Sequence, residues 1–288
     1  MARVAVVGVG AIGAVAAAAA QSAGGHELLL CARRPLDEVV VELPDGSAVT
    51  VQGPLLTDPA ALDGPADWVL LAVKAHQTQG AAAWLTALCG PDTTVAVLQN
   101  GIDHVERVTP LAGDAAVLPT VNWCPVEPAD GGYRQRGPLR LMAPVGGEGL
   151  GDLLGAEAEV EIRDDFVSAA WKKLCANAVA GILAVTGRRT EVLLEPDIRS
   201  LADTMAVECA AVARAEGATL SDDRAREIVA GLAAMPADSS TSILADRAAG
   251  RPLEWEARNA AVGRIARRHG IATPACDAVA ALLHAVSP

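Results

Sequence analysis

Aromatic and basic residues are scarce in this chain. Its 288 residues include five Trp, one Tyr and one Phe, and 23 lysine and arginine residues are outnumbered by 35 aspartate and glutamate residues. The formal net charge is −12. Nucleic-acid modules need aromatic rings that stack on bases or a basic surface for phosphates. The composition therefore argues against a nucleic-acid partner.

The cysteines form no recognisable pattern. Six are scattered along the chain without a C-x-x-C pair: Cys31, Cys89, Cys124, Cys175, Cys209 and Cys276. Such spacing suggests neither a disulfide framework nor a zinc site. We expect reduced and mostly buried thiols, no bound metal and a cytoplasmic location.

The amino terminus raises the alternative of a secretion signal. "MARVAVVGVGAIGAVAAAAAQSAGG" has an arginine, an apolar run and then small residues, as such signals do. Gly8, Gly10 and Gly13 suit a helical signal poorly, however, and suit a tight turn between a strand and a helix well. We therefore expect neither a signal peptide nor a membrane partner.

The same glycines predict a dinucleotide site. "RVAVVG" is typical of a buried strand, "GVGAIG" has the spacing G-x-G-x-x-G, and "AVAAAAAQSAG" is typical of a helix. Gly8 would make the turn, Gly10 would let the backbone approach a pyrophosphate, and Gly13 would let the helix pack on the strand. The candidate cofactor-binding residues of this turn are Gly8, Val9, Gly10, Ala11, Ile12 and Gly13.

The end of the second predicted strand, "HELLLCARR", favours NADP over NAD. An NAD site usually has an acidic residue there for the ribose hydroxyl, whereas this chain has Arg33 and Arg34. Guanidinium groups bind a phosphate in a fork geometry. The alternative is that both arginines are ordinary surface charges at a strand end.

Further segments predict an α/β fold with a Rossmann-type doubly wound sheet over residues 1–163. A hairpin is expected around Pro44-Asp45-Gly46, and two apolar strands end before Lys74 and at Asn100. Ligands in such sheets bind beyond the carboxyl ends of the strands. Weaker strands are expected in "AAVLPTVNW", "LRLMAP" and "AEVEIR", with loops around 144–157.

Residues 164–288 predict an all-α domain, because strand patterns disappear and helical periodicity takes over. The expected helices cover 165–186, 195–216, 221–234, 254–269 and 274–286. The first contains "SAAWKKLCANAVAGI". Its apolar residues gather on one face, comprising Trp171, Leu174, Cys175, Ala178, Val179 and Ile182.

Lys173 and Asn177 lie nearly opposite this apolar face, one turn apart and surrounded by small residues. Lys173 is either a surface lysine with alanine neighbours or a functional group that borders a cleft between the two domains. In a partly dry site the ammonium form is disfavoured, and the pKa of the lysine would fall toward neutrality.

Six segments together resemble the ketopantoate reductase family: "GVGAIG", "CARR", "VKAHQ", "LQNGI", "WKKLCANAV" and "STSILADRAAGRPLEWEARNA". The resemblance runs along essentially the whole chain. It implies NADPH-dependent reduction of ketopantoate to pantoate, or of a related 2-oxo acid, with Lys173 as proton donor. It implies substrate contacts from Asn177, Ser242 and Glu254. It also implies cofactor contacts from Arg33, Lys74, Asn100 and Cys124.

Two positions depart from the family pattern. Gly181 stands where the family has a second substrate-holding asparagine, and Glu191 stands near a further asparagine position. Fewer hydrogen bonds to the substrate would reduce discrimination for ketopantoate. A reductase or dehydrogenase of another carbonyl or imine therefore stays open, as does a non-catalytic dinucleotide sensor. A homodimer also stays open, because an apolar helical face serves a core or an interface equally well.

Overall fold

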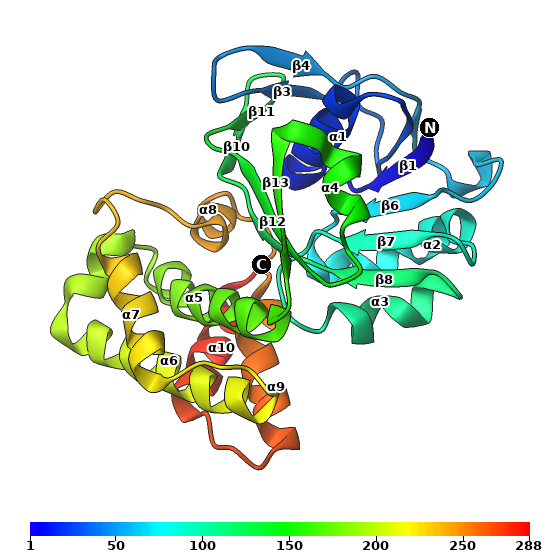
Figure 1. The fold of residues 1–288 in the computed structure, drawn as a ribbon. Coiled ribbons are helices and arrows are strands. Elements are labelled where there is room, and N and C mark those ends of the chain that lie inside the picture. Colours follow the sequence, from blue (N-terminus) through cyan, green and yellow to red (C-terminus); the bar gives the residue numbers. More distant parts are fainter. The chain divides into compact units, whose positions relative to one another are not determined.

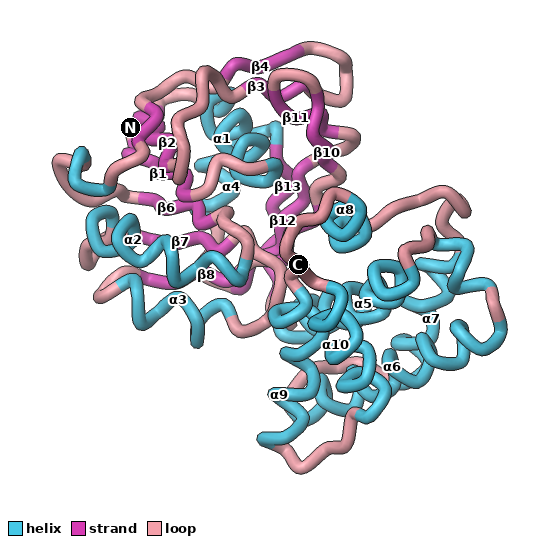
Figure 2. The backbone as a smooth tube through the Cα atoms, turned by 180° about the vertical axis from the view of Figure 1, so that it is seen from behind, coloured by secondary structure: helices cyan, strands magenta, loops and turns pink.

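The computed structural model describes all 288 residues, which form two compact units (Figure 1). The first unit contains residues 1–99 and 103–166, and the second contains residues 100–102 and 167–288. Strands occur in the first unit, whereas the second is helical (Figure 2). None of the helices is both long enough and apolar enough to cross a lipid bilayer.

A six-stranded parallel sheet is the centre of the first unit. Its strand order is β5-β2-β1-β6-β7-β8. The strands are β1 (Ala2–Val7), β2 (His26–Cys31), β5 (Leu55–Leu56), β6 (Trp68–Leu71), β7 (Thr94–Val97) and β8 (Ala116–Pro119). The chain thus runs outward from β1 in one direction and then in the other. The predicted α/β fold with a Rossmann-type sheet and a helical carboxyl-terminal part is confirmed.

Helices cover both faces of this sheet (Figure 1). Side chains of a strand alternate between faces, so Val4 and Val6 join one apolar cluster while Ala5 and Val7 join another. The first cluster includes α1 (Ala11–Ala23) and α4 (Gly149–Leu154), and the second includes α2 (Ala82–Leu88) and α3 (His104–Ala112). The resulting burial on both faces explains why these strands are continuous apolar runs.

Two smaller sheets correct the expectation of a single sheet. The hairpin of β3 (Val40–Glu42) and β4 (Ala48–Thr50) forms, but β3 pairs with β11 (Gly132–Gln135), which in turn pairs with β10 (Val126–Ala129). A further sheet contains β13 (Ala158–Arg163), β12 (Leu139–Pro144) and β9 (Val121–Trp123). Exposed residues such as Ala48 and Thr50 suit a half-solvated sheet and not the doubly covered one.

The expectation of loops throughout 144–157 was also wrong, because α4 lies there. Leu150, Leu153 and Leu154 have helical spacing and are buried in the cluster that contains α1. Short 3₁₀ helices complete this unit at Pro59–Ala61, Ala75–Ala81 and Gly155–Glu157.

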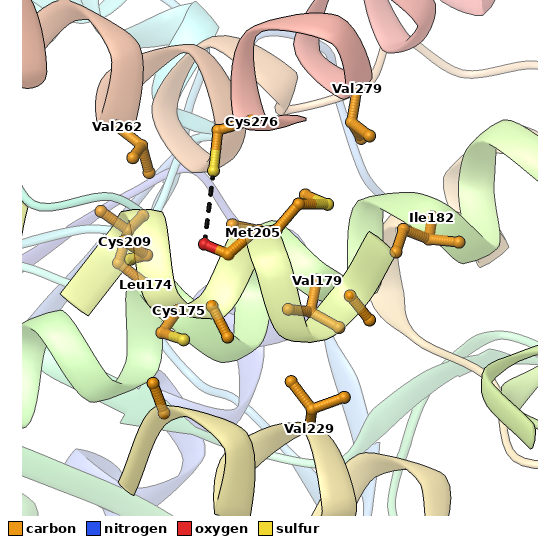
Figure 3. Close-up of a cluster of buried hydrophobic side chains, with 14 of the residues drawn as sticks. Leu174, Cys175, Val179, Ile182, Met205, Cys209, Val229, Val262, Cys276 and Val279 are labelled. Atoms are coloured by element: carbon orange, nitrogen blue, oxygen red, sulfur yellow. Dashed lines mark hydrogen bonds between the residues drawn. The ribbon is translucent and has the colours of Figure 1, made fainter. Parts of the chain in front are cut away.

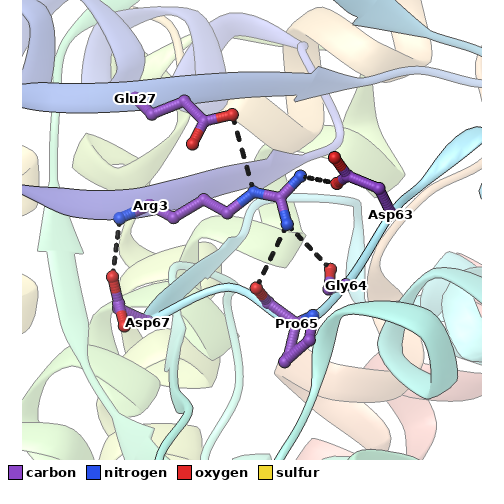
Figure 4. A network of polar contacts seen from close by, with 6 residues as sticks. All are labelled: Arg3, Glu27, Asp63, Gly64, Pro65 and Asp67. Carbon is purple, nitrogen blue, oxygen red and sulfur yellow. Dashed lines mark hydrogen bonds and ion pairs between the residues drawn. The ribbon is translucent and has the colours of Figure 1, made fainter.

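Arg3 anchors the beginning of β1 (Figure 4). Its backbone N–H donates to Oδ2 of Asp67 at 2.7 Å, and its Nη1 donates to the carbonyl oxygen of Gly64 at 3.2 Å. The guanidinium also pairs with Asp63 and lies 3.6 Å from Oε1 of Glu27. Arg3 thereby joins β1 to β2 and to the segment that leads into β6.

The second unit contains six α-helices: α5 (Phe166–Thr186), α6 (Pro196–Ala215), α7 (Asp222–Ala233), α8 (Ser242–Ala248), α9 (Ala261–Arg268) and α10 (Pro274–Val286). A 3₁₀ helix covers Thr190–Leu194, and a π-helical turn covers Glu256–Ala260. The expected helix over 254–269 is therefore a π-helical turn followed by α9, and α8 was not expected.

The core of this unit forms around the predicted apolar face of α5 (Figure 3). Val179 and Ile182 are buried there together with Met205 of α6, and the thiol of Cys276 donates to the carbonyl oxygen of Met205 at 3.5 Å. All six cysteines are reduced, and four of them are buried.

Candidate functional site

The turn between β1 and α1 requires glycine at two positions. Gly8 has φ of +97°, and a Cβ atom there would lie 2.6 Å from the backbone nitrogen of Val73. A Cβ atom on Gly13 would collide with the carbonyl oxygen of Gly8. The first glycine therefore makes the turn possible and the third allows α1 to approach it closely.

The amino-terminal end of α1 is open. Gly10 caps the helix without a side chain, and its carbonyl oxygen accepts the backbone N–H of Ala14 at 2.8 Å. The preceding N–H groups of Ala11, Ile12 and Gly13 have no acceptor within the helix. A Cβ atom on Gly10 would meet no atom within 4 Å. Helix N–H groups beside open space fit the pyrophosphate of a dinucleotide.

Arg33 lies just beyond β2, whose last residue is hydrogen-bonded to this turn. The backbone N–H of Gly8 donates to the carbonyl oxygen of Cys31, the last residue of β2, at 2.9 Å. Arg33 and Arg34 follow Cys31 after the single residue Ala32, and both are exposed. Two cationic side chains thus lie just after β2. An acidic residue at this place would repel a phosphate, whereas guanidinium groups bind one.

Lys74 and Cys124 occupy different surroundings. Lys74 is partly buried and precedes the 3₁₀ helix Ala75–Ala81, three residues beyond the end of β6. Cys124 follows β9 of the mixed three-stranded sheet and packs against an apolar core of the first unit. Burial raises the pKa of its thiol to about 12. This thiol stays neutral near pH 7, so it offers no charge to a ligand.

Asn100 belongs to the second unit and bonds there to two of the predicted substrate residues. Its Nδ2 donates to Oε2 of Glu254 at 3.0 Å, and its Oδ1 accepts from Nδ2 of Asn177 at 3.2 Å. The family resemblance of the sequence implied that Asn100, like Lys74, contacts the cofactor. In the structure its side chain bonds to Asn177 of α5 and to Glu254, which precedes the π-helical turn.

Arg258 extends this hydrogen-bonded chain and was not predicted. Its Nη2 donates to Oδ1 of Asn177 at 2.9 Å, and its Nη1 donates to Oγ of Ser242 at 3.1 Å. The residue is 2% exposed. The chain of hydrogen bonds, called the polar chain below, runs through Glu254, Asn100, Asn177, Arg258 and Ser242.

A signal for Arg258 was present in the sequence. Val262 and Ile265 follow it at four and seven residues, the spacing of one helical face, and both are buried in the helical core. A charged residue on such an apolar stripe is unusual, because a buried charge needs compensating partners.

Lys173 lies one helical turn before Asn177 on α5 and is partly buried. Burial lowers the pKa of its ammonium group, and the positive charge of Arg258 lowers it further, to about 7. Near neutral pH this lysine therefore exists as a mixture of charged and neutral forms. Such a group can donate or accept a proton at little cost.

The two departures from the family pattern lie outside the polar chain. Asn259 donates through Nδ2 to the carbonyl oxygen of Ala178 at 2.8 Å, next to Gly181. Glu191 lies in the 3₁₀ helix Thr190–Leu194, with Oε1 3.5 Å from Nε of Arg188.

Comparisons with known proteins find the same family in both halves of this chain. The model of the family "Ketopantoate reductase PanE/ApbA" matches residues 4–143, and that of its carboxyl-terminal domain matches residues 165–287. The chain is 44% identical to a 2-dehydropantoate 2-reductase of Mycobacterium tuberculosis (strain H37Rv), covering 99% of this chain and 97% of that one.

Solved structures show the same relationship. A PanE/ApbA family ketopantoate reductase from Ralstonia eutropha JMP134 superposes with a TM-score of 0.88 at 30% identity, covering 99% and 98% of the two chains. A D-mandelate dehydrogenase solved with NADH and anilino(oxo)acetate shares the fold, with a TM-score of 0.85 at 22% identity over 99% and 98%. The matches over both parts of the chain lead to one conclusion: the protein belongs to the ketopantoate reductase family of dinucleotide-dependent oxidoreductases.

Proposed function

We propose that the protein uses NADPH to reduce a 2-oxo acid, ketopantoate or a close relative, with Lys173 as the proton donor. The observation that carries the proposal is the pKa of Lys173, lowered to about 7 beside the polar chain. A carbonyl oxygen that receives a hydride on its carbon needs a proton, and an acid with a pKa near the working pH supplies it best.

The first unit would hold the cofactor. Its open helix end fits the pyrophosphate, and Arg33 would bind the 2′-phosphate that distinguishes NADPH from NADH. When bound, the nicotinamide supplies the hydride. The protein's contribution is to bind, to orient and to deliver the proton.

The second unit would hold the substrate. The hydroxyl of Ser242 already accepts a hydrogen bond from Arg258, so its own hydrogen can be donated to a substrate carboxylate. Asn177 uses one N–H for Asn100 and keeps a second for the substrate. Glu254 accepts from Asn100, and its negative charge favours the charged form of Arg258, which binds Asn177 and Ser242.

The glycine at position 181 is a reason to test substrates other than ketopantoate. A glycine offers no side-chain hydrogen bond to a substrate hydroxyl, and a site that lacks such a partner discriminates weakly for that hydroxyl. Related 2-oxo acids without the hydroxyl group of ketopantoate are therefore included as candidates.

A spectrophotometric screen tests the proposal. Loss of NADPH absorbance would be followed with ketopantoate and with a panel of 2-oxo acids that differ in size and in hydroxyl groups. We expect turnover of at least one acid, abolished or strongly reduced in Lys173→Ala. A wild-type enzyme that binds NADPH but reduces none of these acids contradicts the proposal and favours the non-catalytic sensor.

A further inference from the structure

We propose that Arg258 binds the carboxylate of the substrate together with Ser242, and thereby restricts the enzyme to 2-oxo acids whose carboxylate is ionised. The inference rests on the proposed function, because the carboxylate belongs to the 2-oxo acid. It adds a specificity-determining residue that was not among the predicted site residues.

The first argument is the burial of the guanidinium group. Arg258 is 2% exposed, and its hydrogen-bond partners are a hydroxyl oxygen and an amide oxygen, both uncharged. Its Nε is buried without a hydrogen-bond partner. A buried cation is costly unless a negative charge compensates it, and a guanidinium has five N–H donors to offer.

The second argument is the balance of charge around it. Lys173 in its protonated form is a second cation, close enough that Arg258 lowers its pKa. The carboxylates that act on Arg258 have other partners as well: Glu254 accepts from Asn100, and Asp246 lies 2.9 Å from Nε of Arg251. Two neighbouring cations whose carboxylate partners also bind other residues attract a further anion. A substrate carboxylate would be such an anion.

The third argument is the geometry at Ser242. Nη1 of Arg258 donates to Oγ of Ser242 at 3.1 Å, which leaves the hydroxyl hydrogen and a second Nη1 hydrogen for another acceptor. The two oxygens of a carboxylate can accept one hydrogen from each. Charge-assisted pairs of this kind are among the strongest hydrogen bonds in proteins.

The local backbone keeps Arg258 in this position. It lies in the π-helical turn Glu256–Ala260, and its backbone N–H donates to the carbonyl oxygen of Glu254 at 3.2 Å. The next residue, Asn259, bonds to the backbone of α5. The turn is thus fixed against α5 on one side of Arg258, and π-helical turns are frequent at functional sites.

A comparison of acid and amide substrates tests the inference. For the 2-oxo acid with the highest kcat/KM and for its primary amide, kcat/KM would be measured in the wild type and in Arg258→Met. We expect the wild type to prefer the acid by about 10- to 100-fold, the effect of one charge-assisted bond. In Arg258→Met we expect that preference to fall below about threefold, chiefly through KM for the acid.

Two further variants separate binding from folding. Arg258→Lys keeps the charge but not the fork, so it should regain part of the acid preference. Arg267→Met removes a surface charge on α9, where Arg267 lies 3.5 Å from Asp277, and should keep the full preference. If Arg258→Met or Arg258→Lys loses activity on acid and amide equally, Arg258 is structural and the inference is overturned.

A binding measurement does not depend on turnover. Calorimetric titration with oxamate, an unreactive carboxylate, and with ethyl oxamate, its neutral ester, would be done on the NADP⁺ complex. In the wild type and in Arg267→Met, we expect oxamate to bind more tightly than ethyl oxamate. In Arg258→Met, we expect both compounds to bind equally weakly. Oxamate binding that is unchanged in Arg258→Met contradicts the inference, whereas failure of the proposed function appears separately as the absence of NADPH oxidation.

Discussion

A Cβ atom built on Gly181 would lie 2.7 Å from Nδ2 of Asn259. The space beside the α5 backbone is therefore filled by a side chain from the π-helical turn, and residue 181 itself has no room for one. Asn259 is held there by its hydrogen bond to the carbonyl oxygen of Ala178. The absence of an asparagine at 181 is thus linked to the packing of Asn259.

Gly181→Ala should destabilise the protein. The added methyl group would also lie 2.9 Å from Cδ1 of Leu283, and overpacking of this kind costs about 1–3 kcal/mol. Urea unfolding measures the loss. Gly231→Ala is the matched control, because Gly231 is an exposed residue of α7 with no atom within 4 Å of a Cβ. It should stabilise by about 0.5–1 kcal/mol. Equal stability of Gly181→Ala and the wild type would refute this packing argument.

Lys173→Ala should lower kcat by about 10²- to 10⁴-fold, the usual effect of a positioned acid. NADPH affinity should stay nearly unchanged, because the first unit provides the cofactor site. Lys172→Ala should have little effect, since Lys172 points about 100° away around α5. Steady-state kinetics and a fluorescence titration of NADPH measure both quantities. Similar losses in the two variants would restore the interpretation of Lys173 as an ordinary surface lysine.

The rate of reduction should fall as the pH rises through about 7. Only the protonated form of Lys173 can donate a proton, and that form is lost above its pKa of about 7. Removing the positive charge in Arg258→Met should raise this pKa and move the fall in kcat to higher pH. Profiles of kcat against pH for both enzymes provide the comparison. A midpoint in Arg258→Met at or below that of the wild type contradicts the assigned electrostatic effect.

Arg33→Ala should weaken NADPH binding by about 10- to 100-fold and leave NADH binding unchanged, because a charge-assisted pair with the 2′-phosphate contributes about 1.5–3 kcal/mol. Calorimetric titration of both cofactors measures the effect. Arg34→Ala, the exposed neighbour, shows whether the preference depends on one arginine or on both. Equal affinity of the wild type for NADPH and NADH would overturn the preference.

Gly10→Val should block cofactor binding while the protein stays folded. The new side chain would enter the open space next to the helix end, since no atom lies within 4 Å of a Cβ there. A β-branched cap in place of glycine costs about 1 kcal/mol of stability. Circular dichroism and NADPH titration separate the two effects. Unchanged NADPH affinity would show that the pyrophosphate does not approach Gly10.

The parallel sheet, α1 and most helices of the second unit could be predicted, because long apolar runs and helical periodicity are local properties. The separate sheets could not, since nothing within β3 shows that it pairs with β11, some ninety residues later. Arg258 was missed for a similar reason. Its place on an apolar helical stripe is visible in the sequence, but its partner Asn177 is 81 residues away, so the role of its charge is not.

Because of residues 100–102, a single cut in the polypeptide cannot separate the two units. They lie between β7 and α3 in the chain, yet Ile102 packs against the helical core and Asn100 bonds to Asn177 and Glu254. The polypeptide passes between the two units three times. A chimera joined at residue 166 would combine Asn100 from one parent with Asn177 and Glu254 from the other. Recombination between relatives that keeps the polar chain intact has to exchange this three-residue loop together with the helices.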